Sequence, residues 1–426
     1  MESLIRKNIS LFLTGKLSAA LGSSIYGFVI GLYILAETGS SLSFAITLLL
    51  SVLPHILLAP LAGTLSDRWN RKKLIIFSDF ACAIWLVIIF LIFTFFNQNI
   101  WVLYLATTVL NILNTFYATA VTSAIYNMVG PNALQKAMSL NQAAISTSTI
   151  LGPVLGGVLF GFFHISTFMI INIVTFTISG LANIFISFDL FAEKAEEKGQ
   201  TSIIAELKDG FAYTKSQPFL KNLIMIAIFL NFWFAVFPVA LPYLVLTVRK
   251  MESFQLGIIE GAFSVGMLIM SIILAQKQEI KKKDLSIIGG LFGMSIVLVL
   301  IGVPSIPGLS GLSNTVFFPY LIVLVLLLSS FIMLINMPVM VLLQKSTPDA
   351  YRGRVMSLLE AGASAMTPLG FILFGLVLEK VPVWILLAFC GLCVIILTIR
   401  TIKGGAFVQS LRAIETTQEV SLETSV

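Results

Sequence analysis

The chain of 426 residues is 58% hydrophobic and only 11% charged, with a formal net charge of +6. Soluble domains are about 45–50% apolar and about 25% charged. The composition therefore excludes an ordinary soluble protein and predicts one that lies in a lipid bilayer. In a soluble protein the positive charge would suggest a nucleic-acid partner. Here we expect it to come from basic loops on the cytoplasmic side, and we expect no nucleic acid.

The apolar residues are gathered into long segments. A spanning helix needs about 20 apolar residues, because the hydrocarbon core is about 30 Å thick and each helical residue rises about 1.5 Å. Three stretches without Asp, Glu, Lys or Arg are each long enough for two spans, and residues rich in Asn, Gly or Pro divide them near 97–99, 161–164 and 304–313. In chain order, the twelve predicted spans are 10–36, 42–65, two within 80–135, two within 137–188, 218–247, 254–276, two within 285–344, 354–378 and 381–400.

Basic residues fall on alternate sides of these spans. With the N-terminus in the cytoplasm, only Arg249, Lys250 and Lys380 would lie in outer loops. The other 23 of the 26 Lys and Arg residues, Lys16 among them, would belong to cytoplasmic segments, which carry such an excess in membrane proteins. We therefore expect a multi-pass protein of a bacterial-type inner membrane with both termini in the cytoplasm. The apolar run at 9–36 is too long for a signal peptide and is expected to be retained.

The longest polar connection divides six predicted spans from six. We expect an N-terminal six-helix bundle at 1–190, a cytoplasmic linker at 191–217, a C-terminal six-helix bundle at 218–403 and a disordered cytoplasmic tail at 404–426. Within the linker, residues 201–215 place apolar side chains on one face and predict an amphipathic helix on the membrane surface. A plain solvated linker is the alternative.

Two segments in matched positions of the halves resemble each other. Residues 131–140 read PNALQKAMSL and residues 348–358 read PDAYRGRVMSL, an offset of 217 that becomes 218 after a one-residue insertion. Each segment enters a span rich in small residues. Repeated halves are the general plan of secondary transporters. We therefore expect an all-α membrane protein with two pseudo-symmetric six-helix bundles.

The loop after the second predicted span, GTLSDRWNRKK, contains an ordered set of Gly, Asp and basic residues. The set is Gly63, Asp67, Arg68, Arg71 and Lys72. An acid at a helix end among several bases can form a charge lock on the cytoplasmic face, which would favour the outward-open state. The alternative is a basic cluster that only sets topology.

The fifth predicted span carries the run GPVLGG, with Gly152, Pro153, Gly156 and Gly157. Glycines let helices approach closely, and a Pro removes one backbone donor and permits a bend. This combination suits a helix that moves against a partner helix. Ordinary close packing at Gly is the alternative.

These motifs resemble those of a known family. The loop at 63–73 resembles the signature between helices two and three of the major facilitator superfamily, with Asn70 in the place of its usual second Gly. Asn tolerates a left-handed backbone, so we expect the turn to survive. GPVLGG resembles the antiporter signature of facilitator-type exporters. With residues 54–73 and 347–358, the chain is similar to the branch that contains macrolide-efflux proteins and the enterobactin exporter.

The resemblance implies the major facilitator fold and export coupled to proton entry. One departure affects the proton mechanism. Drug–proton antiporters of this family usually carry an Arg in the fourth span, whereas this span, about 100–124, has Asn111 and Asn114 at its centre. An Arg-linked mechanism is therefore not carried over.

Ionisable residues inside the spans are functional candidates, because a charge at membrane depth is costly. Glu260 and Glu360 are the main candidates for proton or cation handling, since their spans offer no basic residue to neutralise them. A carboxyl held neutral by polar neighbours, or wetted near the interface, is the alternative. Asp79 is expected to pair with the basic loop at 68–73. Glu37, at the outer end of the first span, is a further candidate.

Other polar and aromatic residues complete the candidate set. His55 follows Pro54 in the second span, where it would relay protons or serve as a hydrogen-bonded structural residue. Asn231 and Trp233 lie ahead of Pro238 in the seventh span and suit a substrate-binding wall, with lipid-facing aromatics as the alternative. We see no metal-ligand pattern and no catalytic cluster, so we expect no metal, no cofactor and no enzymatic activity.

We therefore expect a monomeric secondary transporter that exports small amphiphilic, drug-like or macrolide-like molecules by alternating access in exchange for protons. A nucleotide-driven pump would need a G-x-x-x-x-G-K-[ST] phosphate loop, which the sequence does not contain. Two alternatives remain open. One is an importer or facilitator of another small solute, and the other is a membrane scaffold or receptor that transports nothing.

Overall fold

The structure is a computed structural model, and it describes residues 2–96, 98–191, 211–276, 283–308, 313–347 and 349–403. These residues form helices joined by turns, and they contain no β-strand. Twelve of the described segments are long and apolar enough to cross a membrane. The predicted all-α fold of twelve spanning helices is confirmed. The predicted tail lies outside the described residues, and so does the predicted amphipathic helix except for its end, where residues 211–216 are helical.

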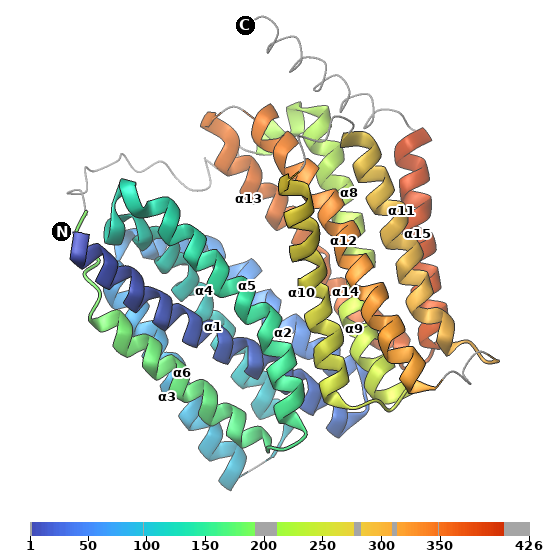
Figure 1. The fold of residues 1–426 in the computed structure, drawn as a ribbon, viewed down its shortest axis with the longest axis horizontal. Helices are drawn as coiled ribbons and strands as arrows, with labels where there is room; N and C mark the ends of the chain where they lie inside the picture. The colour runs from blue at the N-terminus through green and yellow to red at the C-terminus, as the bar shows by residue number, and fades with distance from the viewer. Residues whose placement is uncertain are drawn as a thin grey trace, which may run out of the picture. The chain divides into compact units, whose positions relative to one another are not determined.

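Six helices form the first six spans (Figure 1). They are α1 (Glu2–Thr38), α2 (Ser41–Arg68), α3 (Arg71–Phe95), α4 (Ile100–Val129), α5 (Pro131–Phe160) and α6 (Ile165–Ile184). The predicted breakers near 97–99 and 161–164 separate α3 from α4 and α5 from α6. Asn99 caps α4 by accepting a hydrogen bond from the Trp101 N–H at 3.1 Å, which explains why the helix begins there.

Asn70 has a different role from the one expected. Its φ of −64° and ψ of 112° are those of an extended residue, so the expected left-handed turn is wrong. Its side chain accepts a hydrogen bond from the Lys73 N–H at 3.1 Å and caps α3. Asn is among the residues most favoured at a helix N-cap. Asn therefore fits this position because a helix begins there.

The remaining spans are built from more pieces. They are α8 (Pro218–Phe234), α9 (Val236–Pro242), the π-helix η1 (Tyr243–Val248), α10 (Ser253–Gln276), α11 (Lys283–Gly302), the 3₁₀ turn η2 (Val303–Ser305), α12 (Asn314–Ser346), α13 (Asp349–Ala365), α14 (Thr367–Leu378) and α15 (Val383–Lys403). The predicted seventh span, 218–247, corresponds to the single candidate span Phe219–Val248, which is interrupted and consists of α8, α9 and η1. The predicted eleventh span, 354–378, corresponds to the candidate span Leu358–Leu378, which is interrupted between the end of α13 and the start of α14.

Prolines explain both interruptions. A Pro has no N–H to donate to the carbonyl four residues earlier, and its ring crowds that carbonyl. Pro238 therefore leaves the carbonyl of Phe234 without a helical donor, and the helix breaks at Ala235. Pro368 likewise leaves the carbonyl of Ser364 without a helical donor, and the helix breaks at residue 366.

A third proline is accommodated without a break. Pro338 lies inside α12 and cannot donate to the carbonyl of Leu334. The hydroxyl of Ser286 on α11 donates to that carbonyl at 3.0 Å. A neighbouring helix therefore replaces the missing backbone donor, as is common in membrane proteins.

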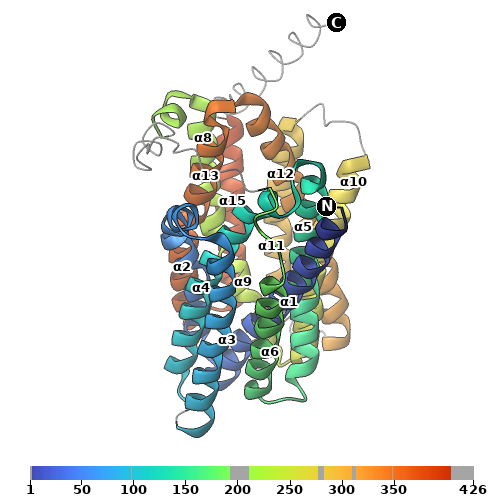
Figure 2. The ribbon, with the colours of Figure 1, turned by 90° about the vertical axis from the view of Figure 1, so that its left-hand side faces the viewer.

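The described helices form two compact units. Unit 1 comprises Met1–Lys198 and Pro242–Gly261, and unit 2 comprises Gly199–Leu241 and Ala262–Val426. Within unit 1, α1 packs against α5 and α6 (Figure 1), and α3 packs against α4 (Figure 2). The predicted bundle boundaries at 1–190 and 218–403 stay a prediction, since the units are defined by packing and residues 242–261 group with unit 1.

The two bundles repeat one close helix contact. A Cβ added at Gly152 on α5 would collide with the side chain of Ser24 on α1. A Cβ added at Gly370 on α14 would lie 2.6 Å from the Cβ of Ala235 and 2.9 Å from the carbonyl oxygen of Phe232. Gly152 and Gly370 are 218 residues apart, the offset of the sequence repeat. In each bundle the fifth span therefore needs a residue without a side chain where it meets the first span.

Candidate transport site

A cavity of about 290 Å³ lies within unit 2, lined by α8, α10, α11, α12, α13 and α15. Most of its lining is Leu, Ile, Met and Phe, and its polar residues are Asn231, Asn336 and Thr401. The Asn231 amide donates to the carbonyl of Ala227 at 2.9 Å, and among the described residues nothing donates to its oxygen. The Asn336 side chain makes no hydrogen bond within the described chain. The cavity therefore has apolar walls and amide groups that can form hydrogen bonds with a ligand.

The cavity lies beside the two broken helices. Asn231 and Phe234 line it from the last turn of α8, and Ala363 lines it from the last turn of α13. Gly370 brings the segment after the second break against Ala235 at the first. Discontinuous spanning helices often form the substrate sites of secondary transporters, because unwound backbone presents polar groups there. This cavity combines that feature with an apolar wall.

Aromatic rings form one wall of the cavity. Phe234, Phe237 and Phe263 stack in series, with ring centroids 5.5 and 5.7 Å apart. Phe234 and Phe263 line the cavity. Trp233 faces elsewhere and lines an open groove of about 570 Å³ between α8 and α15. Of the two residues predicted for this wall, the structure places Asn231 in the cavity and Trp233 in the groove.

A buried polar cluster lies inside unit 1, where α1, α3, α4 and α6 meet. Asp79 on α3 is only 1% exposed. Its Oδ2 accepts hydrogen bonds from Ser179 Oγ at 2.9 Å and Asn183 Nδ2 at 2.8 Å, both on α6. Its Oδ1 has no hydrogen-bond partner among the described residues. The expected pairing of Asp79 with the basic loop at 68–73 is wrong, because its partners come from α6.

Lys16 belongs to the same cluster. It lies within α1, which begins at Glu2, and its predicted place in a cytoplasmic segment stays a prediction. Its Nζ lies 5.1 Å from the ring centroid of Tyr117 on α4, within cation–π range. Gly15 allows this arrangement, since a Cβ there would lie 3.3 Å from the Cβ of Ala182 and 3.4 Å from the Cα of Ser179. The close approach of α1 to α6 brings the ammonium group toward Asp79.

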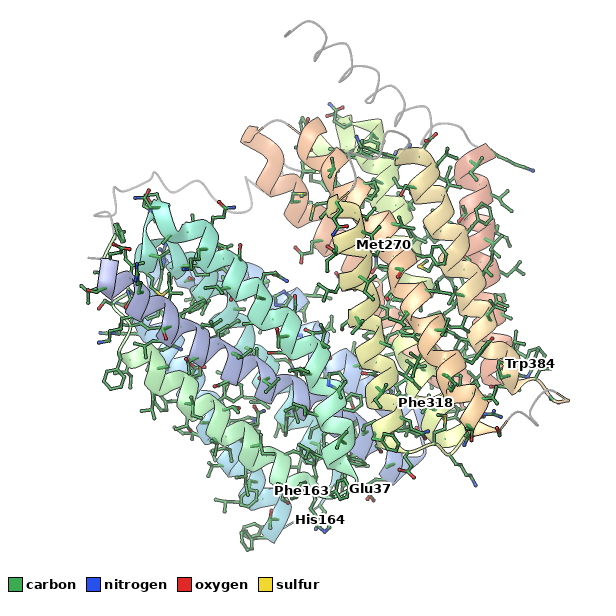
Figure 3. The ribbon with its side chains drawn as sticks, in the orientation of Figure 1. Glu37, Phe163, His164, Met270, Phe318 and Trp384 are labelled. Atoms are coloured by element: carbon green, nitrogen blue, oxygen red, sulfur yellow. The ribbon has the colours of Figure 1, made fainter. Side chains whose placement is uncertain are left out.

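The other ionisable candidates are not brought together. Glu260 is partly buried on α10 and makes no hydrogen bond or ion pair with the described residues. Glu360 and His55 have exposed side chains on α13 and α2. Glu37 is exposed at the end of α1, and Phe163 and His164 belong to the turn that joins α5 to α6; Figure 3 labels all three. Their predicted roles in proton or substrate handling stay predictions.

The predicted gating loop joins α2 to α3. Arg71 Nη1 donates to the carbonyl of Ser123 on α4 at 3.0 Å, and Lys72 Nζ donates to the carbonyl of Ile186 at 2.9 Å. These bases therefore hold the start of α3 against neighbouring segments of unit 1. Gly63 lies within α2, where an added Cβ would meet nothing within 4 Å. The side chains of Asp67 and Arg68 lie outside the described residues, so the charge lock stays a prediction.

The glycine motif of α5 serves two contacts within unit 1. Gly152 and Gly156 face α1, where a Cβ at Gly156 would lie 2.9 Å from the ring of Phe28. Gly157 faces the start of α10, where a Cβ would lie 2.6 Å from the carbonyl oxygen of Ser253. Pro153 lies inside α5, which continues through it. The predicted role of the motif in movement is not tested by these contacts, which are those of close packing.

Several residues of these two sites were not among the sequence candidates. They are Lys16, Tyr117, Ser179, Asn183 and Asn336. The sequence does hold a sign of two of them, because Ser179 and Asn183 are four residues apart and therefore share a face of α6. The described residues hold no group of three or more His, Cys, Asp and Glu placed to bind a metal ion.

The sequence matches the model of a known protein superfamily. The model of the Major Facilitator Superfamily matches residues 12–317, more than half of the sequence. The chain belongs to the Major Facilitator Superfamily. It is therefore a multi-pass membrane transporter, and the predicted major facilitator fold is confirmed.

Relatives within this superfamily are distant. The uncharacterized MFS-type transporter YfiS of Bacillus subtilis (strain 168) is 24% identical over 383 residues, 88% of each chain. Macrolide efflux protein A of Streptococcus pyogenes is 22% identical over 376 residues, 88% of this chain and 90% of that protein. Macrolide efflux protein A of Enterococcus faecalis is 22% identical over 337 residues, 78% of this chain and 99% of that protein.

Solved structures of the same fold are similar to this chain. The nucleoside transporter NupG matches with a TM-score of 0.72 and 12% identity, over 92% of this chain and 99% of its own. A bacterial homologue of the iron transporter ferroportin, in an inward-facing state, matches with a TM-score of 0.65 and 16% identity, over 94% and 98%. At these identities the similarity establishes the fold alone.

Proposed function

We propose that this Major Facilitator Superfamily transporter exports small amphiphilic molecules of the macrolide type across a bacterial inner membrane, in exchange for protons and by alternating access. The observation that carries the proposal is the cavity of unit 2. Its walls are apolar and aromatic, and Asn231 and Asn336 supply the few polar groups that orient a ligand. Its volume of about 290 Å³ is near the lower end for drug-sized ligands, about 300–1,000 Å³.

An apolar groove beside the cavity supports an amphiphilic substrate. Ile226 and Thr401 line both the cavity and the open groove between α8 and α15. The groove is itself mostly apolar, with Met225, Phe229 and Trp233 along α8. An amphiphile dissolved in the membrane could enter the groove and pass beside Ile226 into the cavity.

Export is favoured over import by two further observations. The relatives with a named substrate are macrolide efflux proteins, at about 22% identity. The run GPVLGG in α5 resembles the antiporter signature of exporters, and Gly152 and Gly156 bring α5 close to α1. Because the sequence contains no nucleotide-binding loop, we propose that an ion gradient supplies the energy. We also propose that both termini lie in the cytoplasm and that the transporter is a monomer.

The proposal is tested by accumulation of radiolabelled erythromycin in cells that lack their own macrolide exporters. Cells that express the wild-type protein should hold less erythromycin than cells with an empty vector. Met267→Ala removes contacts from the cavity wall and should weaken the apparent affinity by about tenfold, because loss of apolar contact in a pocket costs about 1–3 kcal/mol.

Leu268→Ala is the matched control, since Leu268 is the next residue of α10 and is 48% exposed. It should export as well as the wild type. Equal accumulation of erythromycin in wild-type and vector cells would overturn the macrolide proposal. Equal loss in Met267→Ala and Leu268→Ala would overturn the assignment of the cavity.

A further inference from the structure

The cluster in unit 1 contains an acidic and a basic side chain that form no ion pair with each other. Asp79 is buried with Oδ2 hydrogen-bonded and Oδ1 unpartnered among the described residues. Lys16 lies over the ring of Tyr117, and no ion pair joins it to Asp79 in the described chain. The Tyr117 hydroxyl is also buried without a partner there. Electrostatic interaction still couples Asp79 with Lys16.

Such an arrangement needs a physical explanation. A buried carboxylate is costly unless it is paired and its oxygens are hydrogen-bonded. Ser179 and Asn183 both donate to the same oxygen of Asp79, so the other oxygen remains available. A purely structural acid would be expected to use both oxygens or to hold Lys16 directly. The Oδ1 atom of Asp79 is therefore available to bind a positively charged species.

We propose that Asp79 binds the proton that the transporter exchanges for its substrate, and that the ammonium group of Lys16 takes the proton's place when it leaves. This inference rests on the proposed proton exchange and names the residue that performs it. With a proton on Oδ1, Asp79 is neutral and Lys16 stays on the Tyr117 ring. When the proton departs, the flexible Lys16 side chain moves to the carboxylate and neutralises it.

A proton fits this cluster better than a metal ion does. A hard cation takes six or more oxygen ligands. Here Asp79 contributes one free oxygen, and Ser179 and Asn183 already direct their donors at the other. A metal ion would also experience the positive charge of Lys16. A proton needs only the free oxygen.

The groups that face Asp79 define its surroundings from every helix packed around it. Lys16 comes from α1, Tyr117 from α4 and Cys82 from α3 itself, while α6 contributes the two neutral donors. Lys16 is partly exposed, whereas Asp79 and Tyr117 are buried. We therefore place the path of the proton to the carboxylate on the side of the bundle that Lys16 occupies.

The cluster is connected to the helix that carries the glycine motif. Lys16 lies on α1, and α1 packs against α5 where Gly152 and Gly156 remove the side chains between them. The nearer of these contacts, Gly152 against Ser24, lies eight residues along α1 from Lys16.

The first test needs no knowledge of the substrate. Dicyclohexylcarbodiimide adds to a protonated carboxylic acid, and the adduct is found by mass spectrometry of the digested full-length protein in detergent. The wild type should carry an adduct on Asp79 that declines from acidic to alkaline pH. Lys16→Met removes the competing charge and should raise the Asp79 adduct at alkaline pH, while Lys7→Met, at an exposed position of the same helix, should leave it unchanged. Absence of the adduct at Asp79 from both wild type and Lys16→Met would overturn the inference.

The second test separates this inference from the proposed function. In proteoliposomes, Asp79→Asn should keep erythromycin exchange at equal concentrations on both sides but lose accumulation driven by a pH gradient. Undiminished gradient-driven accumulation in Asp79→Asn would overturn the role of Asp79 and leave the proposed function intact. A wild type that ignores the gradient would overturn the proposed proton exchange, whatever the labelling shows. Size-exclusion profiles that match the wild type identify folded variants, and Lys16→Met repeats the test if Asp79→Asn fails to fold.

Discussion

At the scale of single residues, the stability of unit 1 depends on how Asp79 is satisfied. Ser179→Ala removes one of the two hydrogen bonds to this buried carboxyl, which the proposal takes as neutral, and should lower the free energy of unfolding by about 1 kcal/mol. Ser216→Ala is the control, because its hydroxyl bonds only the carbonyl of Tyr213 at an exposed helix end and should change stability by less than about 0.5 kcal/mol. Thermal unfolding in detergent measures both. An equal effect of the two substitutions would contradict the account of the cluster.

The sequence alone pointed to Asp79 but not to the residues that form hydrogen bonds with it. Asp79 was recognisable because a charge inside a span is rare. Its partners were not, because Ser179 and Asn183 lie about 100 residues away on α6, and only the packing of α3 on α6 brings them together. Lys16 was not recognised as a partner because charge counting grouped it with the basic loops, whereas the helix packing places it beside the ring of Tyr117.

At the scale of elements, Pro338 and Ser286 form a pair whose members should depend on each other. Ser286→Ala leaves the carbonyl of Leu334 without a donor and should cost about 1 kcal/mol of stability. In a Pro338→Ala background, the new backbone N–H donates to the same carbonyl, and Ser286→Ala should then cost little. A double-mutant cycle on thermal unfolding measures this coupling. Additive effects of the two substitutions would contradict the proposed replacement of the backbone donor.

Helix number was predictable from the sequence, and helix continuity was not. Charge-free stretches and their breakers located all twelve spans, because length and apolarity suffice to define a span. The seventh span reads as apolar from end to end, so hydropathy gives no sign of the break at Ala235. Pro238 and Pro368 break their helices, whereas Pro153 and Pro338 do not. At Pro338 the freed carbonyl has a tertiary partner, Ser286, which a single sequence does not display.

At the scale of the whole molecule, the repeat seen in the sequence appears in the packing. Gly152 and Gly370 occupy matched positions in the fifth span of each bundle, and each meets the first span of its own bundle. The units differ in what they contain. Unit 1 holds the charged cluster around Asp79, and unit 2 holds the apolar cavity around Asn231 and Asn336. The account therefore assigns proton binding to one unit and substrate binding to the other.

The exchange of protons for substrate is the central claim, and one measurement tests it directly. Proteoliposomes containing the wild-type protein and a trapped pH indicator are loaded with erythromycin, diluted into medium without it, and followed for internal pH. The account predicts that erythromycin leaves through the transporter while the interior acidifies, and that protein-free liposomes show neither change beyond passive leakage. Erythromycin efflux through the protein with no change of internal pH would contradict it.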